Sequence, residues 1–375
     1  MIEKKSKIYV AGHLGLVGSA IWKNLQNKGY NNLVGKTIDE LNLMDHNEVD
    51  IFFRKQKPDY VFLAAAKVGG IVANNIYRGQ FIYENLMIQN NVIHNSYKHN
   101  VKKLLFLGST CIYPKEAPQP MPENSLLTSP LEYTNEPYAI AKIAGIKMCE
   151  SYNIQYGTNF ISVMPTNLYG PNDNYDLEKS HVLPALIRKI YLGKCVEENK
   201  MDKIKADFNK RPVEGVDGSA DTDTIFEILH KYGIRLYPDE INKKSNQRNK
   251  KNKVSVEIWG SGSPLREFLW SEELADACVY LMENINFSDL TNPNQKEIRN
   301  THINIGTGKE ISIKNLAFLI KKRIDFKGDL IFNTEKPDGT IRKLTDVSKL
   351  NSLRWKHKIE IEEGVEKMYM WYLEN

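Results

Sequence analysis

The first half of the chain repeats one pattern, a short apolar run followed by a helix-like stretch, and this pattern restricts the possible folds more than any other feature. The apolar runs are residues 7–11, 32–35, 60–66, 104–108 and 160–164. A short, continuous apolar run is typical of a buried strand in a parallel sheet. Strands that alternate with helices predict an α/β fold with a doubly wound parallel sheet, whose ligands bind at the carboxyl ends of the strands.

Three glycines follow the first predicted strand with the spacing G-x-x-G-x-x-G, and a helix is predicted after them over residues 19–28. In a dinucleotide-binding unit, the first glycine permits a tight turn and the second lets the backbone approach a pyrophosphate. The third lets the helix pack closely on the strand. This turn therefore predicts a dinucleotide site, with His13 as a loop residue and not a catalyst. Its residues are Gly12, His13, Leu14, Gly15, Leu16, Val17 and Gly18.

The end of the second predicted strand determines which nucleotide is preferred. An acidic residue there binds the ribose hydroxyls of NAD, whereas a basic residue suits the 2′-phosphate of NADP. This chain has Lys36 at that point, which favours NADP(H). Asp39 is either an adenosine contact or a solvated loop acid. The third predicted strand ends in small residues, including Ala65, across which a cofactor can lie.

Residues 104–142 carry the side chains needed for redox chemistry at a carbonyl group. Tyr138 and Lys142 are four residues apart, which places them one turn apart on the same helix face. A phenol normally keeps its proton to about pH 10, and a neighbouring ammonium lowers that pKa, so Tyr138 is expected to exchange a proton near neutral pH. Ser109 can donate a hydrogen bond to the same carbonyl oxygen. The alternative is a chance pair on the surface, because the spacing is common.

The later segments predict two domains, residues 1–170 and residues 171–375, with the core of the first continuing into the second half. Between about residues 194 and 253 the strand–helix pattern breaks. This stretch is polar, holds one helix-like segment at 222–232 and ends in lysines at 243–251. A long non-repetitive segment of this kind is typical of an insertion. Its lysines are expected to form a solvated face and not a binding patch.

Composition excludes several classes of function. The chain has 375 residues, of which 41% are hydrophobic and 26% charged, as in ordinary globular proteins. The net charge of +5 is mild, so nucleic-acid binding is not expected. Four cysteines without metal-type spacing indicate reduced thiols and no metal site. No signal peptide or spanning segment is evident, so we expect a cytoplasmic protein without a membrane partner.

Taken together, six stretches resemble the GDP-L-fucose synthase family. Ala-Ala-Ala-Lys-Val-Gly-Gly-Ile and Ser-x-Cys-Ile-Tyr-Pro are specific to that family, whereas the glycine turn and Tyr-x-x-x-Lys are shared by the whole superfamily. The resemblance covers nearly the whole chain except the stretch 194–253. It implies a Rossmann-type domain of the extended short-chain dehydrogenase/reductase class, a smaller C-terminal α/β substrate-binding domain and a homodimer. The six stretches are residues 12–18, 64–71, 108–114, 135–142, 165–171 and 259–269.

The resemblance also implies an activity, the NADPH-dependent 3,5-epimerisation and 4-reduction of GDP-4-keto-6-deoxy-D-mannose to GDP-L-fucose. Ser109, Tyr138 and Lys142 carry the reduction in the family, with Lys142 also touching the nicotinamide ribose. Cys111 and His181 take the places of the epimerisation base and acid. Further cofactor contacts fall on Pro165, Thr166, Asn167, Leu168 and His181, and GDP-sugar contacts fall on Asn167, Lys189, Trp259, Arg266 and Asp338.

Two departures from the family bear on cofactor and substrate. The family has arginines that hold the NADP phosphate where this chain has Leu14 and Ile38, and Lys36 is the basic residue left to replace them. The stretch 194–253 lies between two expected sugar-nucleotide contacts, Lys189 and Trp259. It could therefore alter which hexose or heptose is accepted.

Several alternatives compete with this function. One is a C4-reductase, with or without epimerisation, of a related GDP-4-keto-6-deoxyheptose or another GDP-4-keto sugar. A 4,6-dehydratase would carry an acidic pair where this chain has Thr110 and Cys111. From another class, the chain could be a non-catalytic dinucleotide-sensing protein. For single residues, Cys111 could simply pack in the core, and His181 could be a locally satisfied histidine at a helix N-terminus.

Overall fold

The computed structural model describes residues 2–237, 253–292, 294 and 296–375, and it divides the chain into two compact units. The first unit contains the chain up to Asp173 together with residues 267–310 and 343–364. The second contains residues 174–266, 311–342 and 365–375. The chain therefore passes from one unit to the other several times, and each unit is built from segments that are distant in sequence.

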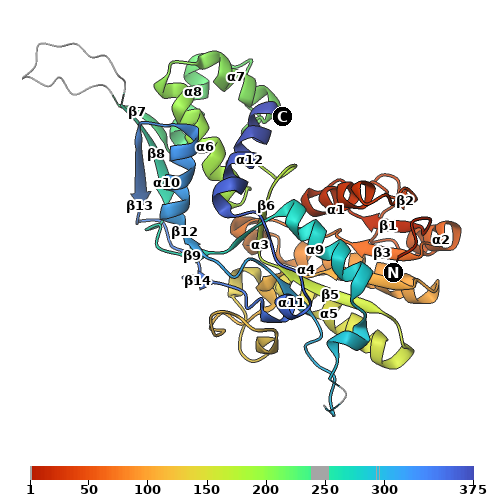
Figure 1. The fold of residues 1–375 in the computed structure, drawn as a ribbon. Coiled ribbons are helices and arrows are strands. Elements are labelled where there is room, and N and C mark those ends of the chain that lie inside the picture. The colour runs from red at the N-terminus through yellow and green to blue at the C-terminus, as the bar shows by residue number, and fades with distance from the viewer. Residues whose placement is uncertain (1, 238–252, 293, 295) are drawn as a thin grey trace, which may run out of the picture. The chain divides into compact units, whose positions relative to one another are not determined.

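The first unit is built on a six-stranded sheet in which every pair of neighbours is parallel (Figure 1). The strand order is β11-β5-β4-β3-β1-β2. The order reverses at β1, because β2 and β3 pair with opposite sides of it, and ligands of doubly wound sheets bind at such a reversal. The predicted Rossmann-type sheet is thus confirmed. The strands are β1 (Ile8–Ala11), β2 (Leu33–Val34), β3 (Tyr60–Leu63), β4 (Lys103–Leu107), β5 (Phe160–Pro165) and β11 (Ile303–Ile305).

Both faces of this sheet are buried, which explains why its strands are continuous apolar runs. On one face, Tyr9 and Ala11 pack in a cluster with α2 (His46–Gln56), α4 (Arg78–Lys98) and α5 (Glu136–Tyr156). On the other face, Ile8 and Val10 pack with α1 (Leu16–Asn27) and α9 (Ser271–Asn284). Side chains alternate between the two faces along each strand, as the pleat requires.

One predicted boundary differs from the structure, and several further elements complete the chain. Helix α1 starts at Leu16, three residues before the prediction, because Gly15 is its N-cap. A short helix, α3 (Ile71–Ile76), precedes α4. Toward the C-terminus the chain forms β14 (Arg342–Lys343), α11 (Ser348–Ser352) and α12 (Ile361–Glu374).

The second unit contains a three-stranded sheet in the order β13-β8-β7. Strand β8 (Lys253–Trp259) pairs in parallel with β13 (Asp329–Asn333) and antiparallel with β7 (Ile234–Tyr237). Helix α6 (Val182–Glu197) contacts β8, β7 and α10 (Ile313–Ile324). Its short strands β9 (Leu265–Arg266) and β12 (Ile311–Ser312) pair antiparallel. The short strands β6 (Asn167–Tyr169) and β10 (Phe268–Trp270) belong to the first unit, where they pair in parallel.

The stretch 194–253 contributes regular structure to this unit. It holds α7 (Met201–Lys210), the predicted helix α8 (Thr222–Lys231) and β7. Ile204 and Phe208 of α7 are buried, and Asp207 accepts a hydrogen bond of 2.9 Å from the fully buried Arg188 of α6. The stretch therefore supplies part of the core of the second unit. The whole lysine run at 243–251 lies outside the described residues, as does the rest of 238–252.

Membrane insertion through a helix finds no support in the described part of the chain. None of the helices there combines the length and the apolar composition needed to span a bilayer.

Candidate active site

The glycine turn after β1 has the geometry expected of a pyrophosphate cradle. Gly12 has a φ of +85°, and a Cβ there would lie 2.8 Å from the backbone nitrogen of Ala65. A Cβ on Gly18 would lie 2.0 Å from the carbonyl oxygen of Gly12, so only glycine lets α1 start this close to the strand. Gly15 precedes α1 and leaves the first N–H groups of the helix without a covering side chain. These residues fit a dinucleotide pyrophosphate.

The rest of the turn and the end of β2 surround the place where an adenosine would lie in such a unit. Leu14 and Ile38 are exposed, and the His13 ring packs 5.4 Å from that of Trp22, measured between centroids. The Lys36 ammonium lies 2.8 Å from a carboxylate oxygen of Glu40. The basic group that was expected to bind the NADP phosphate is therefore already paired with an acid. Asp39 is exposed.

The loop after β3 is held by two amide side chains. Asn85 of α4 accepts a hydrogen bond from the backbone nitrogen of Lys67 and donates one to its carbonyl oxygen, each at 3.0 Å. Asn74 of α3 donates to the carbonyl oxygens of Gly69 and Gly70. These bonds fix the loop at the carboxyl end of β3, next to the glycine turn.

The segment after β4 places a hydroxyl and a thiol at the carboxyl end of the sheet. Ser109 caps the 3-10 turn Thr110–Ile112, and its Oγ accepts a hydrogen bond of 3.4 Å from the backbone nitrogen of Cys111. The Cys111 side chain is buried, and burial raises the pKa of its thiol. Hydrogen bonding with Ser109 and the positive charges of Lys343 and Lys142 act in the opposite direction. No sequence signal pointed to Lys343.

Tyr138 and Lys142 lie on the first turns of α5, on the face that packs toward Cys111 and the end of β4. The Lys142 ammonium donates to the carbonyl oxygen of Leu107 at 2.8 Å and lies 5.7 Å from the centroid of the Tyr138 ring. Burial lowers the pKa of Lys142 to about 8. The prediction that Lys142 lowers the pKa of Tyr138 is wrong, because burial and the nearby Cys111 raise that pKa. Tyr138 is therefore a neutral phenol with a proton to give.

The segment after β5 completes this edge of the sheet. Pro165 ends β5, and the Thr166 backbone nitrogen donates to Ile305 at the end of β11. Asn167 and Leu168 lie in β6, and the Asn167 side chain donates to the backbone carbonyl of Glu267 at 2.8 Å. Ser109, Cys111, Tyr138 and Lys142 thus share the carboxyl edge of one sheet with the glycine turn and the Pro165 segment.

The fully buried Glu267 is a residue that the sequence interpretation missed. Its carboxylate accepts hydrogen bonds from the backbone nitrogens of Thr307, Gly308 and Thr345, at 2.6–2.9 Å. It therefore holds two segments at the carboxyl edge of the sheet, the loop after β11 and the segment around Thr345. The signal was present in the sequence, because an acid inside the apolar run Glu267–Trp270 must have buried hydrogen-bond donors.

The other predicted site residues belong to the second unit. His181 is exposed and stands at the N-cap of α6. Lys189 of α6 donates to the carbonyl oxygen of Glu257 at 2.6 Å, and burial lowers its pKa to about 8. Trp259, at the end of β8, is 63% exposed, with the ammonium of Lys336 5.4 Å from a ring centroid.

Arg266 and Asp338 support the loops near the end of β8. Arg266 donates to the carbonyl oxygen of Thr340 at 2.6 Å. Both carboxylate oxygens of Asp338 accept hydrogen bonds from Ser261, one from its backbone nitrogen and one from its hydroxyl. The Asp338 carboxylate thus stabilises the turn after β8 through its hydrogen bonds to Ser261. The exposed Trp259 ring is accessible for stacking with a ligand.

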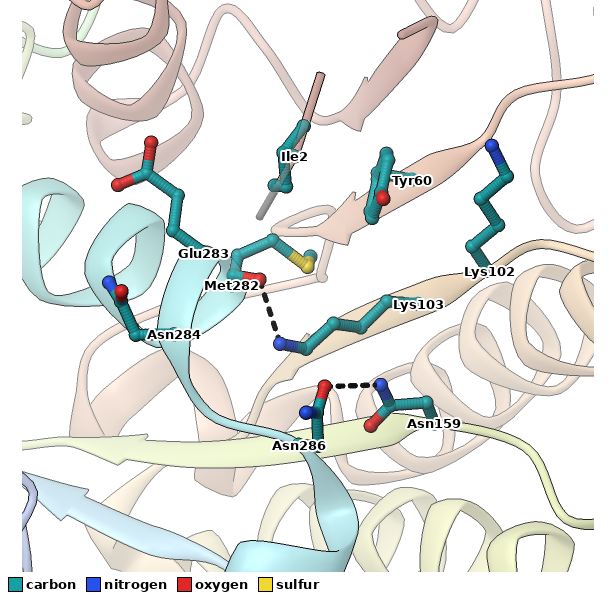
Figure 2. A pocket seen from close by; sticks show the side chains of 9 residues that line it. All are labelled: Ile2, Tyr60, Lys102, Lys103, Asn159, Met282, Glu283, Asn284 and Asn286. Atoms are coloured by element: carbon teal, nitrogen blue, oxygen red, sulfur yellow. Dashed lines mark hydrogen bonds between the residues drawn. The ribbon is translucent and has the colours of Figure 1, made fainter.

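A cavity of about 390 Å³ lies at the opposite, amino end of the six-stranded sheet. Figure 2 shows its lining, with Tyr60 and Lys103 at the first positions of β3 and β4. The Lys103 ammonium points to the end of α9 and donates to the carbonyl oxygen of Met282 at 2.7 Å (Figure 2). Because doubly wound sheets bind their ligands at the carboxyl ends of the strands, this cavity is not the candidate active site.

Comparisons with known proteins show which family this chain is similar to. The family model described as "NAD dependent epimerase/dehydratase family" matches residues 8–209 and 224–306. A putative GDP-L-fucose synthase 2 of Arabidopsis thaliana is 49% identical over 375 residues, with coverage of 100% of this chain and 94% of that protein.

Two solved structures from Campylobacter jejuni are also similar. A GDP-6-OMe-4-keto-L-xylo-heptose reductase has a TM-score of 0.87 at 47% identity, covering 100% of this chain and 99% of that one. MlghC, a GDP-mannoheptose C4 reductase with NADP bound, has a TM-score of 0.83 at 47% identity, and both chains are covered completely.

Proposed function

The chain belongs to the NAD dependent epimerase/dehydratase family, and we propose that it reduces C4 of a GDP-4-keto-6-deoxy sugar with NADPH, coupled to epimerisation at C3 and C5. The observation that carries this proposal is the set formed by Ser109, Cys111, Tyr138 and Lys142 at the carboxyl edge of the sheet. A silent dinucleotide sensor would have no need of that set.

The reduction requires a proton donor beside the C4 oxygen. NADPH, held along the glycine turn, supplies the hydride when bound. Tyr138 gives its proton to the C4 oxygen, and its raised pKa keeps that proton in place until the oxygen becomes basic. Ser109 donates a hydrogen bond to the same oxygen. The ammonium of Lys142, 5.7 Å from the ring, then stabilises the phenolate that remains.

The epimerisation uses the acidity that the C4 ketone confers on C3 and C5. Removal of either proton gives an enolate delocalised onto the C4 oxygen, which Ser109 and Tyr138 stabilise. Cys111 takes the proton as a thiolate, and His181 returns one to the other face of the sugar. The raised pKa of Cys111 means that its thiol is protonated in the free protein at neutral pH. Epimerisation should therefore become faster as the pH rises from 7 toward the ordinary thiol value of 9.0.

Two sugars fit this chemistry. GDP-4-keto-6-deoxy-D-mannose, giving GDP-L-fucose, is supported by the similarity to the plant synthase. A GDP-4-keto-heptose is supported by the two similar reductases from Campylobacter jejuni. A panel of both keto sugars, compared by kcat/KM, decides between them. A protein that oxidises NADPH with neither sugar would contradict the proposed activity.

The test of the reduction is Tyr138→Phe. We expect NADPH oxidation to fall by about a hundredfold or more, with NADPH binding nearly unchanged, because only the acidic proton is removed. Tyr133→Phe is the matched control, since Tyr133 is an exposed tyrosine close in sequence, and it should keep full activity. Near-normal turnover of Tyr138→Phe would remove Tyr138 from the mechanism.

The test of the epimerisation is deuterium uptake at C3 and C5 in D2O. Wild type should incorporate label, increasingly from pH 7 to 9, whereas Cys111→Ser should lose incorporation before it loses reduction of an already epimerised ketone. Cys278→Ser, at a buried cysteine of α9, is the control. Turnover of wild type without label at either carbon would leave a simple C4-reductase.

We further propose a homodimer and a cytoplasmic location. The paired helices α4 and α5 expose Tyr83, Ile140 and Ile154, which would suit packing against a second copy. All four cysteines are free and buried thiols, as is usual in a reducing compartment. Sedimentation velocity tests the first statement, because a monomer at micromolar concentration would contradict it, and cell fractionation tests the second.

A further inference from the structure

Lys189 is held in an unusual way for a residue expected to bind a phosphate. Its ammonium has one acceptor among the described residues, the backbone carbonyl of Glu257 at 2.6 Å. An ammonium has three N–H donors, so two remain for a ligand. The carboxylate of the same Glu257 is close enough to Lys189 to act on its charge. A carboxylate so placed would normally pair with the lysine and withdraw it from a ligand.

The Glu257 carboxylate is instead occupied by two other side chains. Arg235 of β7 places Nη2 3.0 Å from one carboxylate oxygen, and Asn333 of β13 donates to the other at 3.0 Å. Strands β7 and β13 flank β8 on its two sides (Figure 1). Glu257 is therefore satisfied from both neighbouring strands, and Lys189 meets only its backbone.

We propose that Arg235 is a positioning residue for substrate binding, which occupies the carboxylate of Glu257 and so keeps the Lys189 ammonium available to the diphosphate of the GDP-sugar. This inference rests on the proposed function, and it assigns a task to the stretch 194–253. Strand β7 belongs to that stretch and brings Arg235 opposite Ser255 of β8. Among the described residues, Nε of Arg235 is buried without a hydrogen-bond partner, whereas its Nη2 contacts the Glu257 carboxylate.

The charges around Lys189 agree with this arrangement. Glu257 raises the pKa of Lys189, whereas Arg235 lowers it, and burial lowers it most. Removal of Arg235 would thus expose Lys189 to the full attraction of the Glu257 carboxylate. Removal of that carboxylate would make Arg235 unnecessary. The two changes should therefore compensate in GDP affinity, whereas a purely structural ion pair would compensate in stability and leave GDP affinity unchanged.

The experiment is a double-mutant cycle with GDP as the probe, measured by titration calorimetry and followed by steady-state kinetics. Arg235→Gln should weaken GDP binding about tenfold and raise KM for the GDP-sugar similarly, with kcat and the KM for NADPH unchanged. Glu257→Gln should bind GDP at least as tightly as wild type. The double variant Arg235→Gln/Glu257→Gln should recover wild-type binding, and Arg235→Lys should keep most of it.

Arg299→Gln is the matched control, because Arg299 pairs with Glu297 on the surface of the first unit, and it should change nothing. Unchanged GDP binding in Arg235→Gln, or no recovery in the double variant, would overturn the inference. If Arg235→Gln does not fold, Glu257→Gln decides alone, since a loss of GDP affinity there would contradict the proposal. A wild-type protein that binds no GDP would instead contradict the proposed function.

Discussion

Two buried lysines stand at the opposite ends of strand β4, and they resemble each other closely. Lys103 is the first residue of the strand and is 4% exposed; Lys142, which donates to the carbonyl of the last strand residue, is 3% exposed. Among the described residues, the acceptors of both ammonium groups are backbone carbonyls and not carboxylates. Burial lowers the pKa of both to about 8.

Their surroundings differ. Lys103 donates to the carbonyl oxygens of Leu281 and Met282 in the last turn of α9, where a positive charge meets the negative end of the helix dipole. Lys142 lies beside the phenol of Tyr138 and the thiol of Cys111. A lowered lysine pKa therefore does not identify an active site in this protein. The proposed active site rests instead on the carboxyl end of the sheet and on the proton-exchanging side chains next to Lys142.

The largest expected difference between the two lysines is in catalysis. Lys142→Met should lower reduction by about a hundredfold or more, because the Tyr138 phenolate loses its counter-charge. Lys103→Met should leave kcat/KM within about twofold of wild type, since the amino end of the sheet takes no part in chemistry. The measurement is NADPH oxidation with a GDP-4-keto sugar. Equal losses in both variants would mean that the two lysines cannot be distinguished by their neighbours.

Substitution of Lys142 should lower activity but raise stability. Below pH 8 this lysine is charged in both the folded and the unfolded chain, and the folded state carries the cost of burying the charge. Lys142→Met should therefore raise the free energy of unfolding by about 2 kcal/mol at pH 7. Between pH 8 and the ordinary value of 10.5, the folded state of wild type loses its proton first. The advantage of the variant should shrink over this range, as urea unfolding at pH 7 and pH 10.5 would show.

A smaller change in stability is expected for Lys103→Met. Relief of the buried charge is offset here by the loss of a donor to two carbonyls at the end of α9. The variant should be destabilised by about 1 kcal/mol or less at pH 7. A gain as large as that of Lys142→Met would show that the bonds to Leu281 and Met282 contribute little, and the distinction between structural and catalytic lysines would then rest on activity alone.

Much of the first unit could be predicted from the sequence, because its strands, its glycine turn and its helix spacing depend on residues that are close in sequence. Short apolar runs set the strands, and Gly12, Gly15 and Gly18 occupy positions where a side chain would collide or cover the helix end. The position of Tyr138 relative to Lys142 follows from helix geometry. The direction of the Tyr138 pKa does not follow from that spacing, because it depends on burial by residues from other segments.

The second unit was harder to predict, because its structure depends on contacts between residues that are distant in sequence. Residues 194–253 lack a clear pattern, and deletion of 201–250 would be expected from the sequence alone to leave a folded protein. In the structure Phe208 is buried and Asp207 accepts from the buried Arg188, so the same deletion should unfold the second unit. The partners of Asp207 and Glu257 are far apart in sequence, which local patterns cannot reveal.

The smallest expected effect concerns Lys36, a half-buried lysine, which is a third case to set beside Lys103 and Lys142. Its ammonium is paired with Glu40 at 2.8 Å, so a phosphate must compete with a carboxylate that is already in place. Surface pairs of this kind contribute about 1 kcal/mol or less. Lys36→Ala should therefore lower the preference for NADPH over NADH only a few-fold, and Glu40→Gln should raise it by freeing the ammonium. The ratio of kcat/KM for NADPH to that for NADH measures both effects.

The control is Lys55→Ala, at an exposed lysine of α2, which should leave this ratio unchanged. If NADPH selectivity survives Lys36→Ala intact, another residue reads the 2′-phosphate.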